Sequence, residues 1–147
     1  MVDRKDVGGW LDGPQRRPRE PGAYAGQRLG LPAEGPGSLA TFGRRLVAYL
    51  VDALSCTVIA AGLFRQQSLT VPVFAAEVML LTWLAHGSAG QIATGLRVVR
   101  LDRAPMGLPR AALRTLLICL LIPALVWDRD GRGLHDRAVG TVVLRTR

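Results

Sequence analysis

The chain has 147 residues, enough for one domain with a tail. Hydrophobic residues make up 49% of it and aromatic residues only 5%, a balance that argues against a large water-soluble core. The net charge is +8, but the basic residues flank long apolar runs, which favours a membrane surface over a nucleic-acid partner. We therefore expect no nucleic-acid binding.

The first forty residues show neither helical nor strand periodicity. They are rich in Gly, Pro, Arg and acidic residues, as in GPQRRPREPGAYAG. Such a segment buries too little apolar area to offset the entropy lost on ordering. We predict a disordered tail over residues 1–40 and a domain over 41–147.

Two apolar runs are long enough to cross a bilayer. The first, 46–64, follows Arg44 and Arg45, and the second covers 69–86. At 1.5 Å of rise per residue they reach about 27–29 Å, close to the hydrocarbon thickness of about 30 Å. We predict transmembrane helices over about 44–64 and 69–86.

A third apolar run, 111–127, contains Arg114 and Pro123. Its charge-free part covers only about 20 Å, and the proline removes a backbone hydrogen bond. We predict a short helix over about 110–127 that does not fully span. It either enters the membrane and returns to the same side, or lies partly buried at the cytoplasmic face.

Arginines are distributed unevenly around these runs. The loop between the first two holds only Arg65, whereas the tail, the segment after the second run and the C-terminal segment are basic. The positive-inside rule therefore predicts two cytoplasmic termini, with residues 65–68 outside.

Two β-branched segments flank the third run. They read LRVVRL, 96–101, and TVVLR, 141–145. Both ends of the third run must lie on one side if these segments are to pair, and we predict a small antiparallel ribbon at the cytoplasmic face. The expected fold is thus an all-α integral membrane protein with two transmembrane helices, a short third helix and this ribbon.

Two carboxylates, Asp52 and Glu77, interrupt the predicted spans. An ionised carboxylate facing lipid is costly, so each should face the bundle interior, with Arg97 or Arg114 as the expected partner of Asp52. Glu77 should lie about 6 Å deeper in the membrane than Asp52. The pair forms either a proton or cation path, which would need an oligomer, or polar contacts that hold the helices together.

Other signals of chemistry are weak. Two cysteines and two distant histidines match no metal-site spacing, and GSAGQIATG lacks the Gly-Lys-Ser/Thr ending of a phosphate-binding loop. His135 stands beside Asp136 without a candidate nucleophile. We predict no metal ion, no cofactor and no enzymatic activity.

Three segments, FGRRLVAYLVDAL, GSAGQIATGLRVVRLDRAP and GRGLHDRAVGTVV, carry a resemblance to a known family. In this order they resemble the RDD family of small bacterial membrane proteins. The resemblance implies three motif charges, Arg45 (with Arg44 as the alternate), Asp52 and Asp136, and a loop motif of Gly90, Gln91 and Gly95. We expect Asp136 to pair with Arg44 or Arg45 at the cytoplasmic face.

The resemblance implies architecture more than chemistry, because the family's function is unsettled and cation/proton antiport has been suggested. We expect a protein of the bacterial plasma (inner) membrane that contacts the bilayer and other membrane proteins or a second copy of itself. Its predicted role is that of a non-catalytic accessory, assembly or scaffold protein. The alternative is a small cation/proton transporter or antiporter subunit that works as an oligomer.

Overall fold

The computed structural model describes residues 22–120, 126 and 131–147. The elements in chain order are η1 (Gln27–Leu29), α2 (Phe42–Gly62), η2 (Gln67–Leu69), α3 (Thr70–Ala85), α4 (Ala89–Ala93), β1 (Leu96–Arg100), α5 (Leu108–Cys119), α7 (Leu134–Val139) and β2 (Thr141–Arg145).

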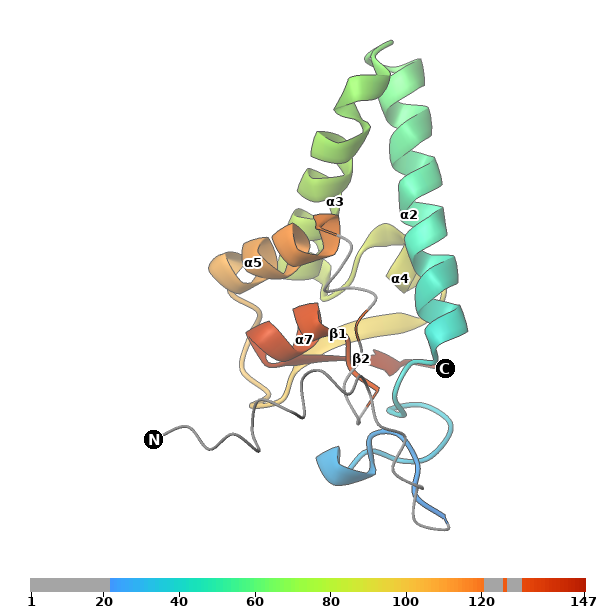
Figure 1. Ribbon diagram of the computed structural model, residues 1–147, viewed down its shortest axis with the longest axis vertical. Helices are drawn as coiled ribbons and strands as arrows, with labels where there is room; N and C mark the ends of the chain where they lie inside the picture. Colours follow the sequence, from blue (N-terminus) through green and yellow to red (C-terminus); the bar gives the residue numbers. More distant parts are fainter. Residues whose placement is uncertain (1–21, 121–125, 127–130) are drawn as a thin grey trace, which may run out of the picture.

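Helices α2 and α3 form a tall hairpin above a base that contains the two strands, α5 and α7 (Figure 1). Within the described residues, two helical segments are long and apolar enough to cross a membrane, Phe42–Gly62 and Gln67–Ala85. The first, with 21 residues, reaches about 31 Å. The prediction of two membrane-length helices is confirmed, with ends that differ by one or two residues.

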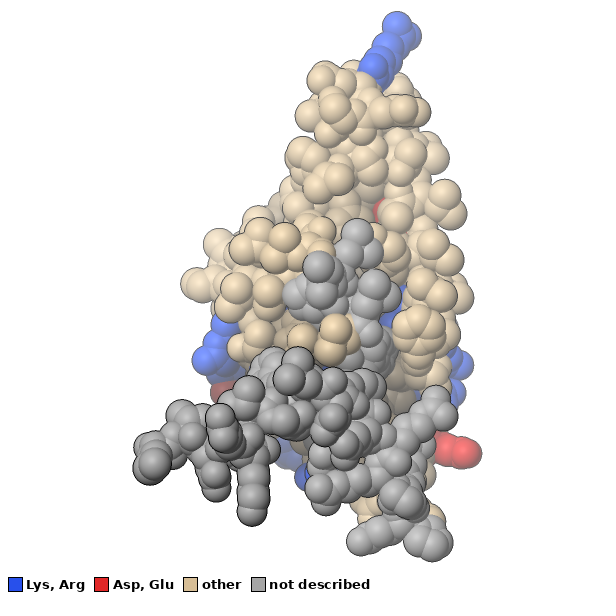
Figure 2. All heavy atoms as spheres, viewed as in Figure 1, with Lys and Arg blue, Asp and Glu red and all other residues tan. Residues whose placement is uncertain are grey.

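Helix α2 of the hairpin buries small and polar side chains and exposes large apolar ones. On α2 the buried residues are Ala48, Asp52, Cys56 and Ala60, each four positions after the last, so they share one helix face. Leu54 and Val58 on the same helix are 66% and 69% exposed. Figure 2 shows a largely uncharged hairpin with basic side chains at its tip and around its base. This distribution suits a lipid environment, because small interfacial residues let helices approach closely there.

Helix α5 is shorter than the predicted helix over 110–127. It ends at Cys119, where the Leu120 N–H bonds to the carbonyls of Leu116 and Ile118, and residues 121–125 and 127–130 lie outside the described part of the chain. Its twelve residues reach about 18 Å, less than a bilayer core. The buried face carries Arg114 and Thr115. Its exposed large apolar side chains are Leu108, Leu113 and Leu116, followed by Leu120 directly after the helix.

Strands β1 and β2 pair antiparallel, in register from Leu96 opposite Arg145 to Arg100 opposite Thr141. This confirms the predicted ribbon and brings both flanks of the third apolar run to the same place. Val98 and Val143, which are 0% and 1% exposed, face each other across the pair. The ribbon packs into a core with Ala48 of α2 and Ala111 of α5.

The predicted tail over 1–40 is wrong at its C-terminal end. Ser38, Leu39 and Ala40 are buried, and the Ala40 N–H donates to the Val143 carbonyl at 2.9 Å. These residues pair with the free edge of β2. Such pairing satisfies backbone N–H and carbonyl groups of both segments and does not require a run of apolar side chains. Residue composition therefore did not reveal it. Residues 1–21 lie outside the described part of the chain.

Candidate functional site

Four side chains from three helices meet beneath the hairpin, and we call Arg45, Arg114, His135 and Asp136 the charge cluster. The Arg114 Nε donates to Asp136 Oδ1 at 2.9 Å, and the Arg45 Nη1 donates to Asp136 Oδ2 at 3.4 Å. The His135 Nε2 lies 3.3 Å from the same Oδ2. The cluster therefore joins α2, α5 and α7 through one carboxylate.

Asp136 is completely buried, and its side chain is 0% exposed. Burial alone would raise its pKa, but the Arg114 guanidinium, His135 and Arg45 outweigh that effect and hold the pKa of this carboxyl well below its ordinary value. Thr141 at the start of β2 donates to Asp136 Oδ1 as well, at 3.1 Å. The carboxylate is thus ionised and anchored on several sides.

The structure brings Arg45 and Asp136 together as expected from the sequence, and it separates the alternate, Arg44. The Arg44 Nη1 donates to the Arg147 carbonyl at 3.1 Å. Sequence reasoning missed Arg114 as the closer partner of Asp136. The signal was present, since an arginine in an apolar run must find a buried anion, but the sequence did not say which one.

A second group of contacts holds the first turn of α4, and we call Asp52, Glu77, Ser88, Ala89 and Gly90 the α4 cap. Asp52 Oδ1 accepts the Gly90 N–H and Asp52 Oδ2 accepts the Ser88 hydroxyl, both at 2.5 Å. Glu77 Oε1 accepts the Ala89 N–H at 2.7 Å. Two carboxylates from the hairpin therefore bind N–H groups that have no partner within the helix, at its positive end.

The α4 cap corrects the expected partner of Asp52 and shows where Glu77 binds. Asp52 bonds to the start of α4 and to neither expected arginine, because Arg97 is exposed and Arg114 bonds to Asp136. Glu77 and Asp52 meet at the same helical turn, because they bind the successive N–H groups of Ala89 and Gly90, and their difference in membrane depth stays a prediction. The chain after α3 folds back against the hairpin, and this return could not be read from residue counts along each helix.

Each residue of the loop motif has a local structural role. Gln91 closes a capping box with Ser88, whose N–H donates to Gln91 Oε1 at 3.1 Å. A Cβ on Gly90 would lie 2.1 Å from the Ala48 carbonyl oxygen, so only glycine lets α4 approach α2 this closely. Gly95 has a φ of +70°, a conformation that other residues rarely adopt. The Ser-x-x-Gln spacing of Ser88 and Gln91 is the sequence signal for the start of α4.

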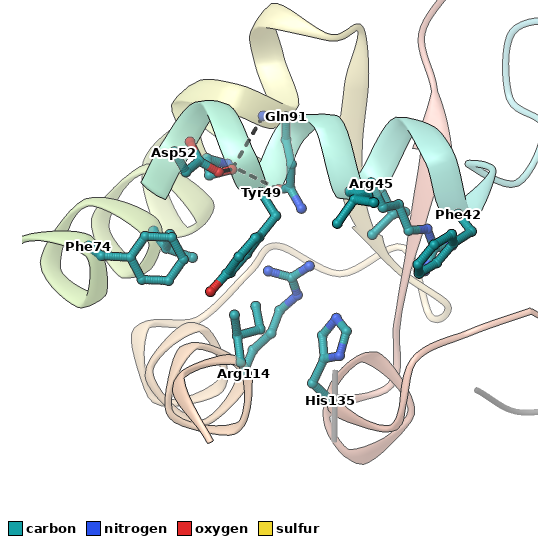
Figure 3. A pocket seen from close by; sticks show the side chains of 13 residues that line it. Phe42, Arg45, Tyr49, Asp52, Phe74, Gln91, Arg114 and His135 are labelled. Carbon is teal, nitrogen blue, oxygen red and sulfur yellow. Dashed lines mark hydrogen bonds between the residues drawn. The ribbon is translucent and has the colours of Figure 1, made fainter. Parts of the chain in front are cut away.

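A cavity of about 170 Å³ lies between the charge cluster and the α4 cap, with walls from α2, α3, α4, α5, α7 and β2. Figure 3 shows the Arg114 guanidinium pointing from α5 into the space between Tyr49 and His135. The rings of Tyr49 and Phe74 meet edge to face, 5.5 Å apart. Asp52 also lines this space, so the cavity combines apolar walls with charged groups of both signs.

The side chains of the charge cluster and the α4 cap bind one another and the backbone. In the part of the chain that the structure describes, no group of three or more His, Cys, Asp or Glu side chains is placed to hold a metal ion. The carboxylates of both groups bind arginines, hydroxyls or backbone N–H groups. The arrangement can hold helices together and can accept or donate hydrogen bonds inside the cavity.

Comparison with protein families gives one match. The model of the RDD family matches residues 66–140, about half of the chain. The chain belongs to the RDD family. This is a family of small membrane proteins, which agrees with the two membrane-length helices. No curated protein and no solved structure matches the chain.

The matched residues hold only part of the RDD motif proposed from the sequence. Asp136, the loop motif and Glu77 lie inside 66–140, whereas Arg45 and Asp52 come before it on α2. The geometry nevertheless links the two parts of the chain. Arg45 reaches Asp136 across 91 positions of sequence, and Asp52 reaches Gly90 across 38.

Proposed function

We propose that this RDD protein is a non-catalytic accessory, assembly or scaffold protein of the bacterial plasma membrane. The observation that carries the proposal is that its carboxylates bind groups that join helices. Asp136 binds two arginines, and Asp52 and Glu77 bind the first turn of α4. Groups held this way position helices, and this supports a role in which the folded surface is presented to other molecules.

The exposed surface supports membrane and protein partners. Leu116 of α5 and Leu120 directly after it are 59% and 58% exposed, while Arg114 of α5 is 1% exposed. A helix with this pattern is stable where lipid or another membrane protein covers the leucines. The proposed partners are the bilayer and other membrane proteins or a second copy of this chain.

Both termini are proposed to face the cytoplasm, with the hairpin tip around Arg65 on the opposite side. Reporter fusions at Arg65 and after Arg147 test this topology. The fusion after Arg147 should be active only with a cytoplasmic reporter and the fusion at Arg65 only with an external one, because arginines are retained on the cytoplasmic side. An external signal from the C-terminal fusion would contradict the proposed topology.

A small cation/proton transporter or antiporter subunit is the alternative. Two observations favour it: the Glu77 Oε2 is buried without a hydrogen-bond partner among the described residues, and Asp52 lines the cavity. A carboxyl group with an unsatisfied oxygen can take up a proton. Transport would need an oligomer, because two membrane-length helices do not enclose a pathway.

Substitutions of Asp52 separate the two functions. In the accessory function, Asp52→Asn should fold, because an amide oxygen can still accept the Gly90 N–H. Asp52→Leu should be about 1–3 kcal/mol less stable, because the Gly90 N–H and the Ser88 hydroxyl lose their acceptor. It should also no longer assemble into a complex. Size measurement in mild detergent should show wild type and Asp52→Asn as complexes larger than one chain.

The control for this series is Ser55→Leu, which places a leucine on the exposed side of the same helix and should behave as wild type. Proteoliposomes with a pH-sensitive dye complete the test. Proton or sodium flux in wild type that is lost in a well-folded Asp52→Asn variant would overturn the accessory function in favour of transport.

A further inference from the structure

The Arg114 side chain lines the cavity and has one buried donor without a hydrogen-bond partner among the described residues. Its side chain is 1% exposed, and its Nε is committed to Asp136. Its Nη1 is buried and has no hydrogen-bond partner among the described residues. Leaving a buried donor of a charged group unpaired is costly, so an acceptor that reaches this nitrogen from the cavity would be bound favourably.

The charges around the cavity favour an acceptor that is negative. Arg45 and Arg114 share the single carboxylate of Asp136. Asp52 also lines the cavity, but its two oxygens accept from Gly90 and Ser88. The guanidinium of Arg114 carries a full positive charge, so a negatively charged oxygen would form a charge-assisted hydrogen bond with it, which is shorter and stronger than a bond to a neutral acceptor.

The remaining walls favour an apolar chain next to that oxyanion. They include Tyr49, Phe74, Val78 and Ile118. Phe42 and Leu46 also line the cavity and are 52% and 44% exposed, so its wall reaches the outer surface of the membrane-length helix α2. A volume of about 170 Å³ is close to that of cavities that hold a single ring-sized molecule. It accommodates a headgroup and the first carbons of a chain whose remainder lies along α2.

We propose that this cavity binds an amphiphile whose head is a carboxylate or phosphate oxyanion, with the head at Arg114 and the apolar chain leaving past Leu46 towards lipid. This site is separate from the assembly role proposed above, because it depends on the cavity and not on the exposed leucines.

Amphiphiles that share one chain length test the proposal. Dodecanoate, dodecyl phosphate and uncharged dodecanol are titrated into the full-length protein in nonionic detergent, with bound molecules counted by native mass spectrometry. At least one of the two anions should bind about tenfold more tightly than dodecanol, because an anion forms a charge-assisted hydrogen bond with Arg114 and dodecanol does not. The comparison of the two anions identifies the head. Inorganic phosphate should bind at least tenfold more weakly than dodecyl phosphate, because it makes no apolar contacts.

Two Val→Phe variants form a matched pair. Val78→Phe fills the cavity without removing a charge and should weaken binding of the preferred anion about tenfold or more. Val58→Phe places the same side chain on the exposed face of α2, where Val58 is 69% exposed, and should leave binding unchanged. If Val78→Phe does not fold, Leu46→Trp at the partly exposed wall should weaken binding in the same way.

Arg114→Lys tests the head contact. Lysine keeps the positive charge near Asp136 but lacks the planar fork, so the preference for the anion over dodecanol should fall while dodecanol binding stays the same. Three results would overturn the proposal: equal binding of dodecanol and both anions, undiminished anion binding by a folded cavity-filling variant, or inorganic phosphate binding as tightly as dodecyl phosphate.

Discussion

Replacing Asp136 with asparagine should destabilise the protein by about 3–5 kcal/mol, the range expected when one partner of a buried ion pair is removed. The variant removes the negative charge that Arg114 and Arg45 both contact, at a site where the carboxylate is 0% exposed. Because these groups join three helices, α7 should detach from α2 and α5. Thermal unfolding in detergent measures the loss.

The matched control is Asp102→Asn, the same change at a carboxylate that is 55% exposed and pairs with Arg100 at the surface. Its melting temperature should be nearly that of wild type, because solvent screens an exposed pair. Equal effects of the two variants would show that the charge cluster contributes no more than a surface pair.

Acid should remove the same stabilisation. The arginines lower the pKa of Asp136 in the folded state, against the effect of burial. The ionised carboxylate therefore stabilises the fold most at pH values above the pKa of this carboxyl in the unfolded chain. The difference in stability between wild type and Asp136→Asn should therefore be full above about pH 5 and shrink as the pH falls further. Exchanging Arg45 and Asp136 should not restore stability, because the exchange places a guanidinium beside Arg114.

Gly90→Ala should have the second largest effect on stability, a loss of about 3 kcal/mol at the upper end of the range for overpacking. The added Cβ would lie 2.1 Å from the Ala48 carbonyl oxygen and 2.9 Å from Asp52 Oδ1. Backbone cannot yield as a flexible side chain does, so α4 must move away from α2 and lose its bond to Asp52. Thermal unfolding of the detergent-solubilised protein measures this loss.

Gly43→Ala is the control for Gly90→Ala, because a Cβ on Gly43 meets nothing within 4 Å and alanine favours the helix. It should match or slightly exceed wild type in stability. In addition, Gly90→Ala combined with Asp52→Leu should cost less than the sum of the two, because both break the same contact. Additive losses would indicate that α4 stays in place in the Gly90→Ala variant.

Length and hydropathy along the chain were sufficient to predict the two long helices. A helix of about twenty apolar residues satisfies its own backbone, so its existence depends on local sequence alone. The ribbon was predicted for a related reason: the β-branched segments 96–100 and 141–145 flank a run too short to cross, which requires that they lie on one side. The Arg45–Asp136 pair came from the family resemblance and from the expectation that both residues lie at one face.

The partners of the remaining buried charges were decided only by the tertiary structure. Arg114 and Asp52 each needed a buried partner, and the sequence offered several. Arg114 bonds to Asp136 because α5 and α7 pack together, and Asp52 caps α4 because the chain after α3 folds back where Gly90 lets it meet Ala48. Likewise, residues 38–40 are ordered by the free edge of β2. Sequence alone determined which groups could not face lipid, because the free energy of placing a charged side chain in lipid is a property of that residue. The choice among acceptors depended on contacts between distant segments, whose energies are set by three-dimensional packing.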